Sequence, residues 1–384
     1  MKKLGLFLTL LVSLFILSSC DFLFIEEEEE KIIYDVNEYT LNELLDLVEK
    51  MMDDSFERIR YDLDSFEEAA TDMLERRGDT VVGIRVGGLI SSGTASGVIY
   101  RKSGDHYYVV TNHHVIHPDD RATPFSQVEI VYERNGMLFT ISNNNTEILG
   151  LDRTTDLAVI RFTSSRNFPV AEFGDSYDLK SGQFVYAIGN PLGFDYFGSV
   201  TMGVVSGLAR FVPGSEYEVP FLQHDAAISP GNSGGGLFDI NGQLIGINNM
   251  KIVEDATTNI NFAIPSNTVH RIVTELEESG QVQRPYFGIE AASGVSACGQ
   301  EYGVCVSRVD TDGTAIDSGL EAGDIIIGYR LESWEEYVDV YNFNDLREAI
   351  LNSQVGDNVS VKYIRDDQTY ESPYVPLVIH PDDR

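Results

Sequence analysis

The chain has 384 residues, with 27 basic and 61 acidic side chains and a formal net charge of −34. Its length suggests two or three domains, and 43% hydrophobic residues is enough material for folded cores. A chain this acidic would not release counterions from a phosphate backbone, which argues against nucleic-acid partners. It would also be repelled by an anionic membrane surface, which argues against electrostatic adhesion to lipid. Three cysteines are too few for a disulfide framework or a multi-cysteine zinc site.

The first 20 residues have the pattern of an export signal. Lys2 and Lys3 precede an uncharged apolar run over 4–17, and small residues then lead to Cys20. This arrangement resembles a bacterial lipoprotein signal, in which Cys20 would be lipidated and anchor the protein to the membrane. The alternatives are an uncleaved signal anchor and ordinary secretion, because residues 4–25 nearly reach the length of a membrane span. All three place the protein outside the cytoplasm, in or beyond the cell envelope.

Residues 21–79 are predicted to form an acidic, helical, membrane-proximal extension. The acidic run Glu26–Glu30 is expected to stay extended and solvated. From Thr40 to Arg77, apolar residues recur at helical spacing behind a capping box. A second capping box at Ser65 leaves open whether this is one helix or two. The apolar stripe fits a self-associating stalk and a face that packs on the next domain about equally well.

Between residues 80 and 265 the sequence changes to short β-branched and aromatic runs separated by Gly, Asn, Asp and Pro. This spacing predicts an all-β sandwich or barrel. The predicted strands are 81–86, 97–100, 107–111, 128–132, 137–141, 157–162, 184–188, 200–206, 237–240, 244–247 and 261–263.

Three loops among these strands carry the side chains of nucleophilic catalysis. His114 follows one strand, Asp156 precedes another, and Ser233 lies in a glycine-rich turn. A serine hydroxyl is a weak nucleophile that needs a base, and the base needs an acid to fix its tautomer. Glycines around Ser233 allow backbone N–H groups to converge where an oxyanion would form.

Two other interpretations of these motifs are rejected. Gly231-x-Ser233-x-Gly235 fits a nucleophile elbow, but that motif requires a strand–turn–helix, whereas strands are predicted after Ser233. A cluster of histidines suggests zinc, but no HExxH-type motif accompanies it, so we expect neither a metal nor another cofactor. The histidines concerned are His106, His113, His114 and His117.

Several stretches resemble the HtrA/DegP family of trypsin-like serine proteases: TNHHV, TDLAVIRF, AIGNPLG, TMGVVSGLAR, LQHDAAISPGNSGGGLFDINGQLIGIN and NFAIPSN. The resemblance implies a mainly β fold, with a chymotrypsin-like double β-barrel over residues 80–265. By motif position it assigns His114 as general base, Asp156 as the acid that orients it, and Ser233 as nucleophile. His113, the neighbouring histidine, is expected to be structural.

The resemblance also implies an oxyanion hole and a specificity pocket. The backbone amides of Gly231, Asn232 and Ser233 would form the oxyanion hole. The primary pocket would be lined by Ala227 and Ile228, with Asn249 on the facing strand. Because none of these is acidic, we expect a small to medium apolar residue before the scissile bond, with loose selectivity.

Residues 266–284 are predicted to be a linker helix, with the helix itself over 266–279 and Val269, Ile272, Val273 and Leu276 on its apolar face. Residues 285–384 resemble one α+β PDZ domain. The resemblance rests on YFGI, GLEAGDII and a helical pattern over 343–351. Such domains bind C-terminal peptides by β-augmentation, here through the loop amides of Tyr286, Phe287, Gly288 and Ile289. The alternative is a purely structural cap.

Two features of this region depart from the PDZ pattern or leave a question open. A long segment over 329–342, with the single Trp334, replaces a short hairpin and is expected to cover or reshape the peptide groove. Cys298 and Cys305 fit a disulfide in an oxidising compartment and two buried thiols equally well.

Together these features predict a serine endopeptidase of the cell envelope that degrades unfolded or damaged exported proteins. The PDZ domain would select C-terminal peptides or gate activity, and the family resemblance implies a homotrimer or a higher oligomer. The alternatives are a signalling protease that cuts one membrane protein after a peptide cue, and a protein that acts mainly as a chaperone or scaffold. An intact triad disfavours the pure scaffold.

Overall fold

The computed structural model describes residues 22–27, 30–35, 46, 50, 64–87, 92–117, 124–212, 219–249, 259–292, 298–299 and 302–383. The predictions of an export signal and of lipidation at Cys20 lie outside these residues. The chain divides into two compact units, residues 1–71 and 72–384. Within the described part of the chain, no helix has the length and apolarity to cross a bilayer.

The first unit contains two strands that the sequence analysis did not predict. β1 (Phe22–Glu27) and β2 (Glu30–Asp35) pair in antiparallel register, with Phe22 opposite Asp35. Part of the acidic run is therefore extended, as expected, but it is paired in a sheet, which the sequence analysis did not predict. Residues 64–77 are helical, as predicted, but 51–63 are outside the described residues, so the question of one helix or two stays open.

The second unit begins with a seven-stranded antiparallel sheet. Its strands are β3 (Val81–Gly87), β4 (Ser92–Ser103), β5 (His106–Thr111), β6 (Gln127–Arg134), β7 (Met137–Ile141), β8 (Thr146–Asp152) and β9 (Leu157–Thr163). They are ordered β7-β6-β3-β4-β5-β9-β8. The two ends of the sheet approach each other where the Thr146 hydroxyl of β8 donates to Val128 O of β6 at 2.6 Å. Alternate residues point inward, so Ile84, Val109 and Ile160 are fully buried.

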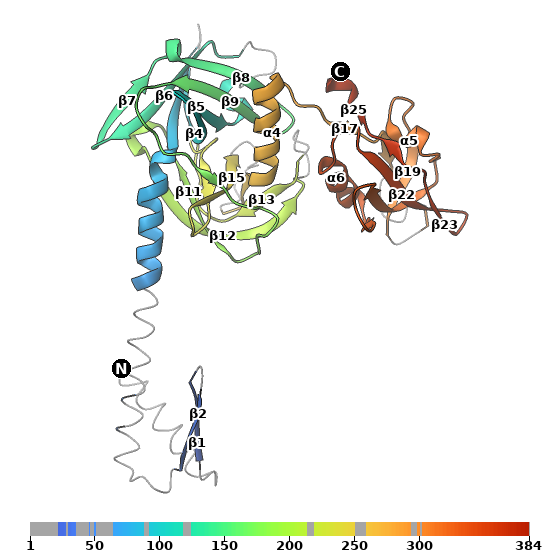
Figure 1. Ribbon diagram of the computed structural model, residues 1–384, viewed down its shortest axis with the longest axis horizontal. Helices are drawn as coiled ribbons and strands as arrows, with labels where there is room; N and C mark the ends of the chain where they lie inside the picture. Colours follow the sequence, from blue (N-terminus) through green and yellow to red (C-terminus); the bar gives the residue numbers. More distant parts are fainter. Residues whose placement is uncertain are drawn as a thin grey trace. The chain divides into compact units, whose positions relative to one another are not determined.

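A second sheet closes into a barrel. Its strands are β10 (Glu172–Phe173), β11 (Phe184–Gly189), β12 (Ser199–Arg210), β13 (Phe221–His224), β14 (Gly236–Phe238), β15 (Gln243–Asn249) and β16 (Asn261–Pro265). The order is β10-β15-β14-β11-β12-β13-β16, and an added β15–β16 pairing closes six of the strands on themselves. The two sheets confirm the predicted mainly β, trypsin-like fold (Figure 1).

Short helical segments connect the strands. Their bounds are η2 (Gly78–Thr80), α3 (His113–Ile116), η3 (Asn143–Asn145) and η4 (Phe194–Tyr196).

The helix α4 (Ser266–Ser279) joins the two barrels, contacting β8 and β9 on one side and β15 and β16 on the other (Figure 1). Its buried residues are the predicted face, Val269, Ile272, Val273 and Leu276. A Cβ on Gly150 of β8 would lie 2.8 Å from the Leu276 side chain. The glycine therefore lets α4 pack closely against β8. The sequence analysis treated α4 as a linker, but its apolar face makes it part of the double barrel.

The C-terminal domain is a small sheet with two helices. Its elements are β17 (Pro285–Tyr286), β18 (Ile289–Ala291), β19 (Val304–Val309), α5 (Thr314–Asp317), β20 (Ile325–Leu331), β21 (Val338–Asp339), α6 (Phe343–Leu351), β22 (Asn358–Arg365), β23 (Gln368–Glu371), β24 (Val375–Pro376), β25 (Val378–Ile379) and η5 (Pro381–Asp383). The strand order is β18-β19-β20-β22-β23, with β21 on β20, β24 on β22, and β17 paired with β25. The predicted helix over 343–351 is confirmed as α6.

The long segment over 329–342 runs back along β20, two strands away from β18. Its strand β21 pairs Asp339 with Gly328, and the Tyr337 hydroxyl shares a 2.8 Å hydrogen bond with Ser360 of β22. Trp334 packs on Tyr329, with ring centroids 6.0 Å apart. This segment therefore covers the middle of the sheet rather than the edge strand β18.

Cys298 and Cys305 form a disulfide, with Cα atoms 5.8 Å apart. The bond links the β18–β19 connection to β19, and it decides the question that the sequence left open in favour of pairing.

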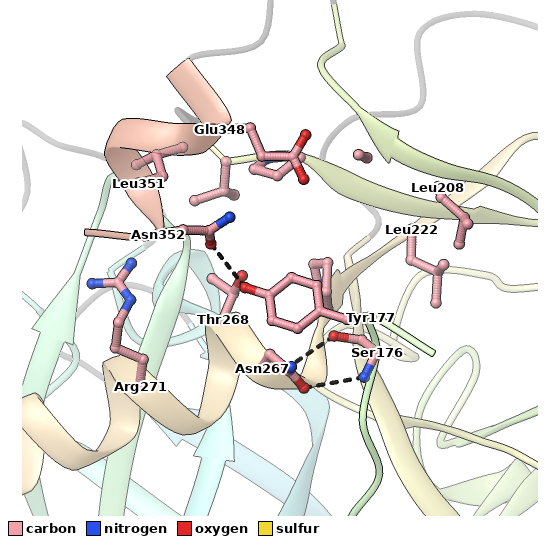
Figure 2. Close-up of a pocket in the computed structure, with 14 residues that line it drawn as sticks. Ser176, Tyr177, Leu208, Leu222, Asn267, Thr268, Arg271, Glu348, Leu351 and Asn352 are labelled. Carbon is pink, nitrogen blue, oxygen red and sulfur yellow. Dashed lines mark hydrogen bonds between the residues drawn. The ribbon is translucent and has the colours of Figure 1, made fainter. Parts of the chain in front are cut away.

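The C-terminal domain meets the double barrel at a cavity of about 270 Å³ between α4, the β12–β13 region and α6 (Figure 2). On one side, the Tyr177 hydroxyl donates to Asn352 Oδ1 at 2.8 Å. Nearby, the Arg347 guanidinium lies 4.7 Å from the Phe211 ring centroid. Leu208 and Leu222 line the cavity with apolar side chains, and Glu348 and Arg271 line it with charged ones.

Candidate active site

The histidine and aspartate of the predicted triad are in direct contact. His114 lies on α3, directly after β5, and Asp156 ends the turn that leads into β9. His114 Nδ1 is 2.6 Å from Asp156 Oδ2, and the His114 N–H donates to Asp156 Oδ1 at 2.9 Å. The Asp156 side chain is fully buried, whereas the imidazole is 19% exposed. This geometry fixes the imidazole with Nε2 free to take a proton.

The backbone around Asp156 is locked into an unusual conformation. Asp156 has φ 58°, in the left-handed region that Asp tolerates better than most residues. Its carbonyl accepts the His113 N–H and the Asn112 amide, each at 3.0 Å. His113 is buried, with its ring 5.4 Å from that of His117, consistent with the structural role expected for it.

Ser233 lies in the loop between β13 and β14, which is packed against the first barrel. Its carbonyl accepts the Ser96 N–H of β4 at 3.0 Å. Gly234 has φ 80° and a Cβ there would overlap the Thr111 hydroxyl, so the nucleophile loop lies on the end of β5, just before His114. Ser233 itself is 6% exposed. The hydrogen bonds of the described residues include none between Ser233 Oγ and His114 Nε2, and such contacts commonly tighten only when substrate binds.

Two of the three predicted oxyanion amides are available. Among the residues that the structure describes, the N–H groups of Gly231 and Ser233 donate no hydrogen bond. The Asn232 N–H instead donates to Ser229 O at 2.9 Å, so it is committed within the loop and does not fit the role that the sequence analysis gave it. Gly231 has φ 104°, and a Cβ there would overlap Asn190 O, which explains why glycine is needed.

Asn249 also lies elsewhere than expected. It is fully buried at the end of β15, and its side-chain amide donates to Asp156 Oδ2 at 2.9 Å. The side chain that was placed in the specificity pocket therefore supports Asp156. The backbone carbonyl of the preceding residue, Asn248, accepts the Gly234 N–H at 3.0 Å. Two adjacent residues of β15 therefore hold Asp156 and the loop of Ser233.

The other two predicted pocket residues lie beside the nucleophile loop. Ala227 is exposed, and its carbonyl accepts the Thr201 hydroxyl at 2.7 Å. Ile228 packs against the core of the second barrel. The acid nearest to them in sequence, Asp225, accepts the Val204 N–H at 2.6 Å, so its carboxylate is tied to β12.

Sequence reasoning passed over three polar residues that hold this site. Ser96 and Asn190 are both fully buried and bond to each other, and Ser96 also bonds to the loop of Ser233. Asn112 holds Asp156. A small polar residue inside an apolar strand was the available signal for Ser96.

His224 of β13 is a buried histidine outside the triad. It is fully buried, and neither ring nitrogen has a hydrogen-bond partner among the described residues. Burial lowers its pKa to about 4, against smaller opposing effects of Asp225, the Ala226 backbone and Asn248. The described residues hold no cluster of three His, Cys, Asp or Glu side chains suited to a metal.

The predicted peptide loop of the C-terminal domain lies beside an edge strand. Phe287 and Gly288 connect β17 to β18, and within the described residues their N–H groups donate no hydrogen bond. Gly288 has φ 80° and sits against Gly313, where a Cβ would collide with the backbone. Phe287 is buried in the domain core, while Tyr286 and Ile289 are half-buried. In the described sheet β18 pairs only with β19, so its outer edge is open to a peptide strand.

Comparison with known proteins decides the family. A family model described as a trypsin-like peptidase domain matches residues 95–247, and one described as a PDZ domain matches 291–372. The serine protease Do-like HtrA of Bacillus subtilis (strain 168) is 37% identical over 293 residues, which cover 72% of this chain and 61% of that protein. This chain belongs to the HtrA family of serine proteases.

Other HtrA relatives agree. The serine protease Do-like HtrA of Lactobacillus helveticus is 36% identical over 71% of this chain and 65% of its own length. Among solved structures, the HtrA-type protease AlgW with tripeptide is 28% identical, with a TM-score of 0.63, over 81% of this chain and 97% of that chain. The serine endoprotease from Yersinia pestis is 27% identical, with a TM-score of 0.57, over 81% and 98%. This HtrA chain spans less than two thirds of the length of these curated relatives.

Proposed function

We propose that this HtrA-family protein is a serine endopeptidase in which Ser233, His114 and Asp156 form the catalytic triad. The observation that carries the proposal is the contact between His114 Nδ1 and Asp156 Oδ2, beside a glycine loop with two unbonded amides. His114 Nε2 takes the Ser233 proton as Oγ attacks the substrate carbonyl, and returns it to the leaving amine. A water activated in the same way then releases the acyl group from Ser233.

The Gly231 and Ser233 amides would stabilise the negative charge that develops on the carbonyl oxygen. Ala227 and Ile228 border the proposed primary pocket. The Asp225 carboxylate accepts the Val204 N–H of β12, and this bond supports cleavage after small to medium apolar residues rather than after basic ones. Cleavage of peptide libraries mainly after Arg or Lys would overturn this part of the proposal.

We further propose that the PDZ domain binds C-terminal peptides along β18 and so selects substrates or gates activity. Support comes from the open edge of β18 and the unbonded amides of Phe287 and Gly288. One solved relative, AlgW, is recorded with a tripeptide. Peptide carboxylate would bind the loop amides while the peptide backbone pairs with β18.

The substrates that we propose are unfolded or damaged exported proteins, met in the cell envelope. The Cys298–Cys305 disulfide supports an oxidising compartment outside the cytoplasm. A lipid on Cys20 and a homotrimeric or larger assembly complete the proposal. Mass spectrometry of the mature N-terminus tests the lipid, and light scattering of the purified protein tests the assembly.

Digestion of unfolded β-casein by the wild type and by Ser233→Ala tests the activity. We expect cleavage by the wild type only, and equal digestion by both proteins would reject the mechanism. Adding C-terminal peptides separates general degradation from the second candidate, a peptide-activated signalling protease. Cleavage only in the presence of a peptide would favour that second candidate, which the open edge of β18 supports.

A further inference from the structure

A single buried serine, Ser96 of β4, connects the first barrel to the nucleophile loop of the second. Its side chain is fully buried, so its polar groups need partners within the protein. The hydroxyl donates to Gly231 O at 2.7 Å and accepts from the Asn190 backbone N–H at 2.9 Å and from its side-chain amide at 3.1 Å. The Ser96 N–H donates to Ser233 O at 3.0 Å. Ser96 thus bonds to both ends of the segment 231–233, in which the N–H groups of Gly231 and Ser233 are the two amides without a partner among the described residues.

These contacts restrain the two amides through the neighbouring peptide units. A peptide unit is planar, so holding its carbonyl also fixes the N–H on the opposite side of the same plane. Pro230 O accepts the Leu192 N–H at 2.6 Å, which orients the Gly231 N–H. The Ser233 N–H belongs to the peptide unit of Asn232 O, which accepts the Gly235 N–H at 2.9 Å. Ser96 holds Gly231 O and Ser233 O, the carbonyls of the peptide units on either side of that one, and so restrains the Ser233 amide from both neighbours. Because Asn190 is two residues before Leu192, its bonds to Ser96 also connect these contacts to the Pro230 carbonyl.

We propose that Ser96 is a positioning residue that sets the oxyanion hole for catalysis by Ser233. The inference rests on the serine-protease function proposed above. Oxyanion donors act only within a few tenths of an ångström of the developing charge, so losing the anchor would weaken transition-state stabilisation more than substrate binding. Ser96 does not touch the substrate, and it acts through the backbone of Gly231 and Ser233.

The chain offers a closely matched control. Ser266, at the start of α4, is also fully buried, and its hydroxyl also donates to a glycine carbonyl, Gly174 O, at 2.7 Å. Changing either serine to alanine removes one buried hydroxyl and leaves one glycine carbonyl without its donor. Ser96→Ala also removes the acceptor of the Asn190 backbone N–H, so it is expected to lose more thermal stability than Ser266→Ala, and only Ser96→Ala changes the active site.

The test is steady-state cleavage of a chromogenic peptide by the full-length wild type, Ser96→Ala and Ser266→Ala. For Ser96→Ala we expect kcat to fall about tenfold or more, with KM within about threefold of the wild type. A peptidyl boronic acid, which forms a tetrahedral adduct on Ser233, should lose affinity in the same proportion as kcat. Ser266→Ala should keep both values. Equal kcat for the two variants, or a rise in KM alone, would overturn the proposal.

Two further measurements keep the proposal testable if Ser96→Ala folds poorly or the wild type proves inactive. Ser96→Cys keeps the shape of the side chain but weakens the three hydrogen bonds of the hydroxyl, and it should show the same loss of kcat. Hydrogen exchange of the amides in residues 229–235 needs no activity. Faster exchange in Ser96→Ala than in Ser266→Ala supports the anchoring, and equal exchange overturns it. If the wild type cleaves no peptide but the loop exchanges faster in Ser96→Ala than in Ser266→Ala, the proposed function would be rejected and the anchoring would be supported.

Discussion

The guanidinium of Arg284 makes a buried ion pair with Asp152, four residues before the catalytic candidate Asp156. Arg284 lies just before the PDZ domain, and its other face pairs with Asp383 near the chain end at 3.1 Å. Its side chain is 10% exposed and that of Asp152 is 7% exposed. Asp152 also accepts the Thr155 N–H at 3.1 Å, within the turn that ends at Asp156. One guanidinium therefore connects the PDZ domain to the turn that presents the triad aspartate.

This relationship predicts a large cost for Arg284→Ala. Removing the guanidinium leaves two carboxylates without their cation, one of them buried, and breaking such a buried pair typically costs about 3–5 kcal/mol. Urea unfolding should show this loss, together with lower activity, because the Asp152 turn loses an anchor. Arg308→Ala is the control, since Arg308 pairs with Glu290 at an exposed site. Similar losses in the two variants would contradict the role of Arg284.

The sequence predicted the architecture well, and it singled out a histidine and an aspartate that the structure brings into contact, for identifiable reasons. The strands around His114 and Asp156 are fully buried runs of β-branched residues, and α4 and α6 have clear helical spacing, so both helices were predicted with the observed bounds. The strands β8, β10 and β13 were missed because they are short or interrupted by polar residues and glycine.

The errors concern backbone groups and side-chain direction, which residue type does not encode. Asn232 was placed in the oxyanion hole, yet whether its N–H is free depends on the turn back to Ser229 O. Asn249 was placed in the pocket, yet its side chain bonds Asp156 from the other barrel, 93 residues away. Ser96 stands out in the sequence only as a small polar residue inside an apolar strand, because folding brings its partners, Gly231 O and Asn190, to it.

Asn249→Ala should slow catalysis without unfolding the protein. The variant removes the 2.9 Å bond from Asn249 to Asp156 Oδ2, the same oxygen that contacts His114 Nδ1. We expect kcat to fall about tenfold, in line with the loss of one charge-assisted hydrogen bond, while KM changes little. Kinetics on a peptide substrate provide the measurement. An unchanged kcat, or a changed preference for the residue before the scissile bond, would restore Asn249 to the specificity pocket.

Gly231→Ala should abolish most activity. Gly231 has φ 104°, and a Cβ would overlap Asn190 O, so the loop must move and the oxyanion amides with it. Loss of one oxyanion donor typically lowers kcat about 100-fold to 1,000-fold. Gly78→Ala is the control, because nothing lies within 4 Å of a Cβ there. The prediction fails if Gly231→Ala retains more than about a tenth of the wild-type kcat.

Peptide binding by the PDZ domain should depend on Gly288. A side chain at φ 80°, against the Gly313 backbone, would displace the loop that carries the Phe287 and Gly288 amides. Fluorescence anisotropy with a labelled C-terminal peptide should show at least about tenfold weaker binding by Gly288→Ala. The same peptide with an amidated C-terminus should bind the wild type weakly. Equal binding of the acid and the amide would argue against carboxylate capture and favour a structural cap.

His224 should make the protein sensitive to acid. Its pKa is lowered by burial from about 6.5 to about 4, so folding favours the neutral ring. The stability it contributes is therefore complete above about pH 6.5 and is lost as the pH falls toward 4, by an amount on the order of 3 kcal/mol. Urea unfolding from pH 7 to pH 4 should show that the free energy of unfolding falls less in His224→Gln than in the wild type. His106→Gln, at an exposed histidine, should behave as the wild type does. If His224→Gln lost as much stability between pH 6.5 and pH 4 as the wild type, His224 could not be the group responsible.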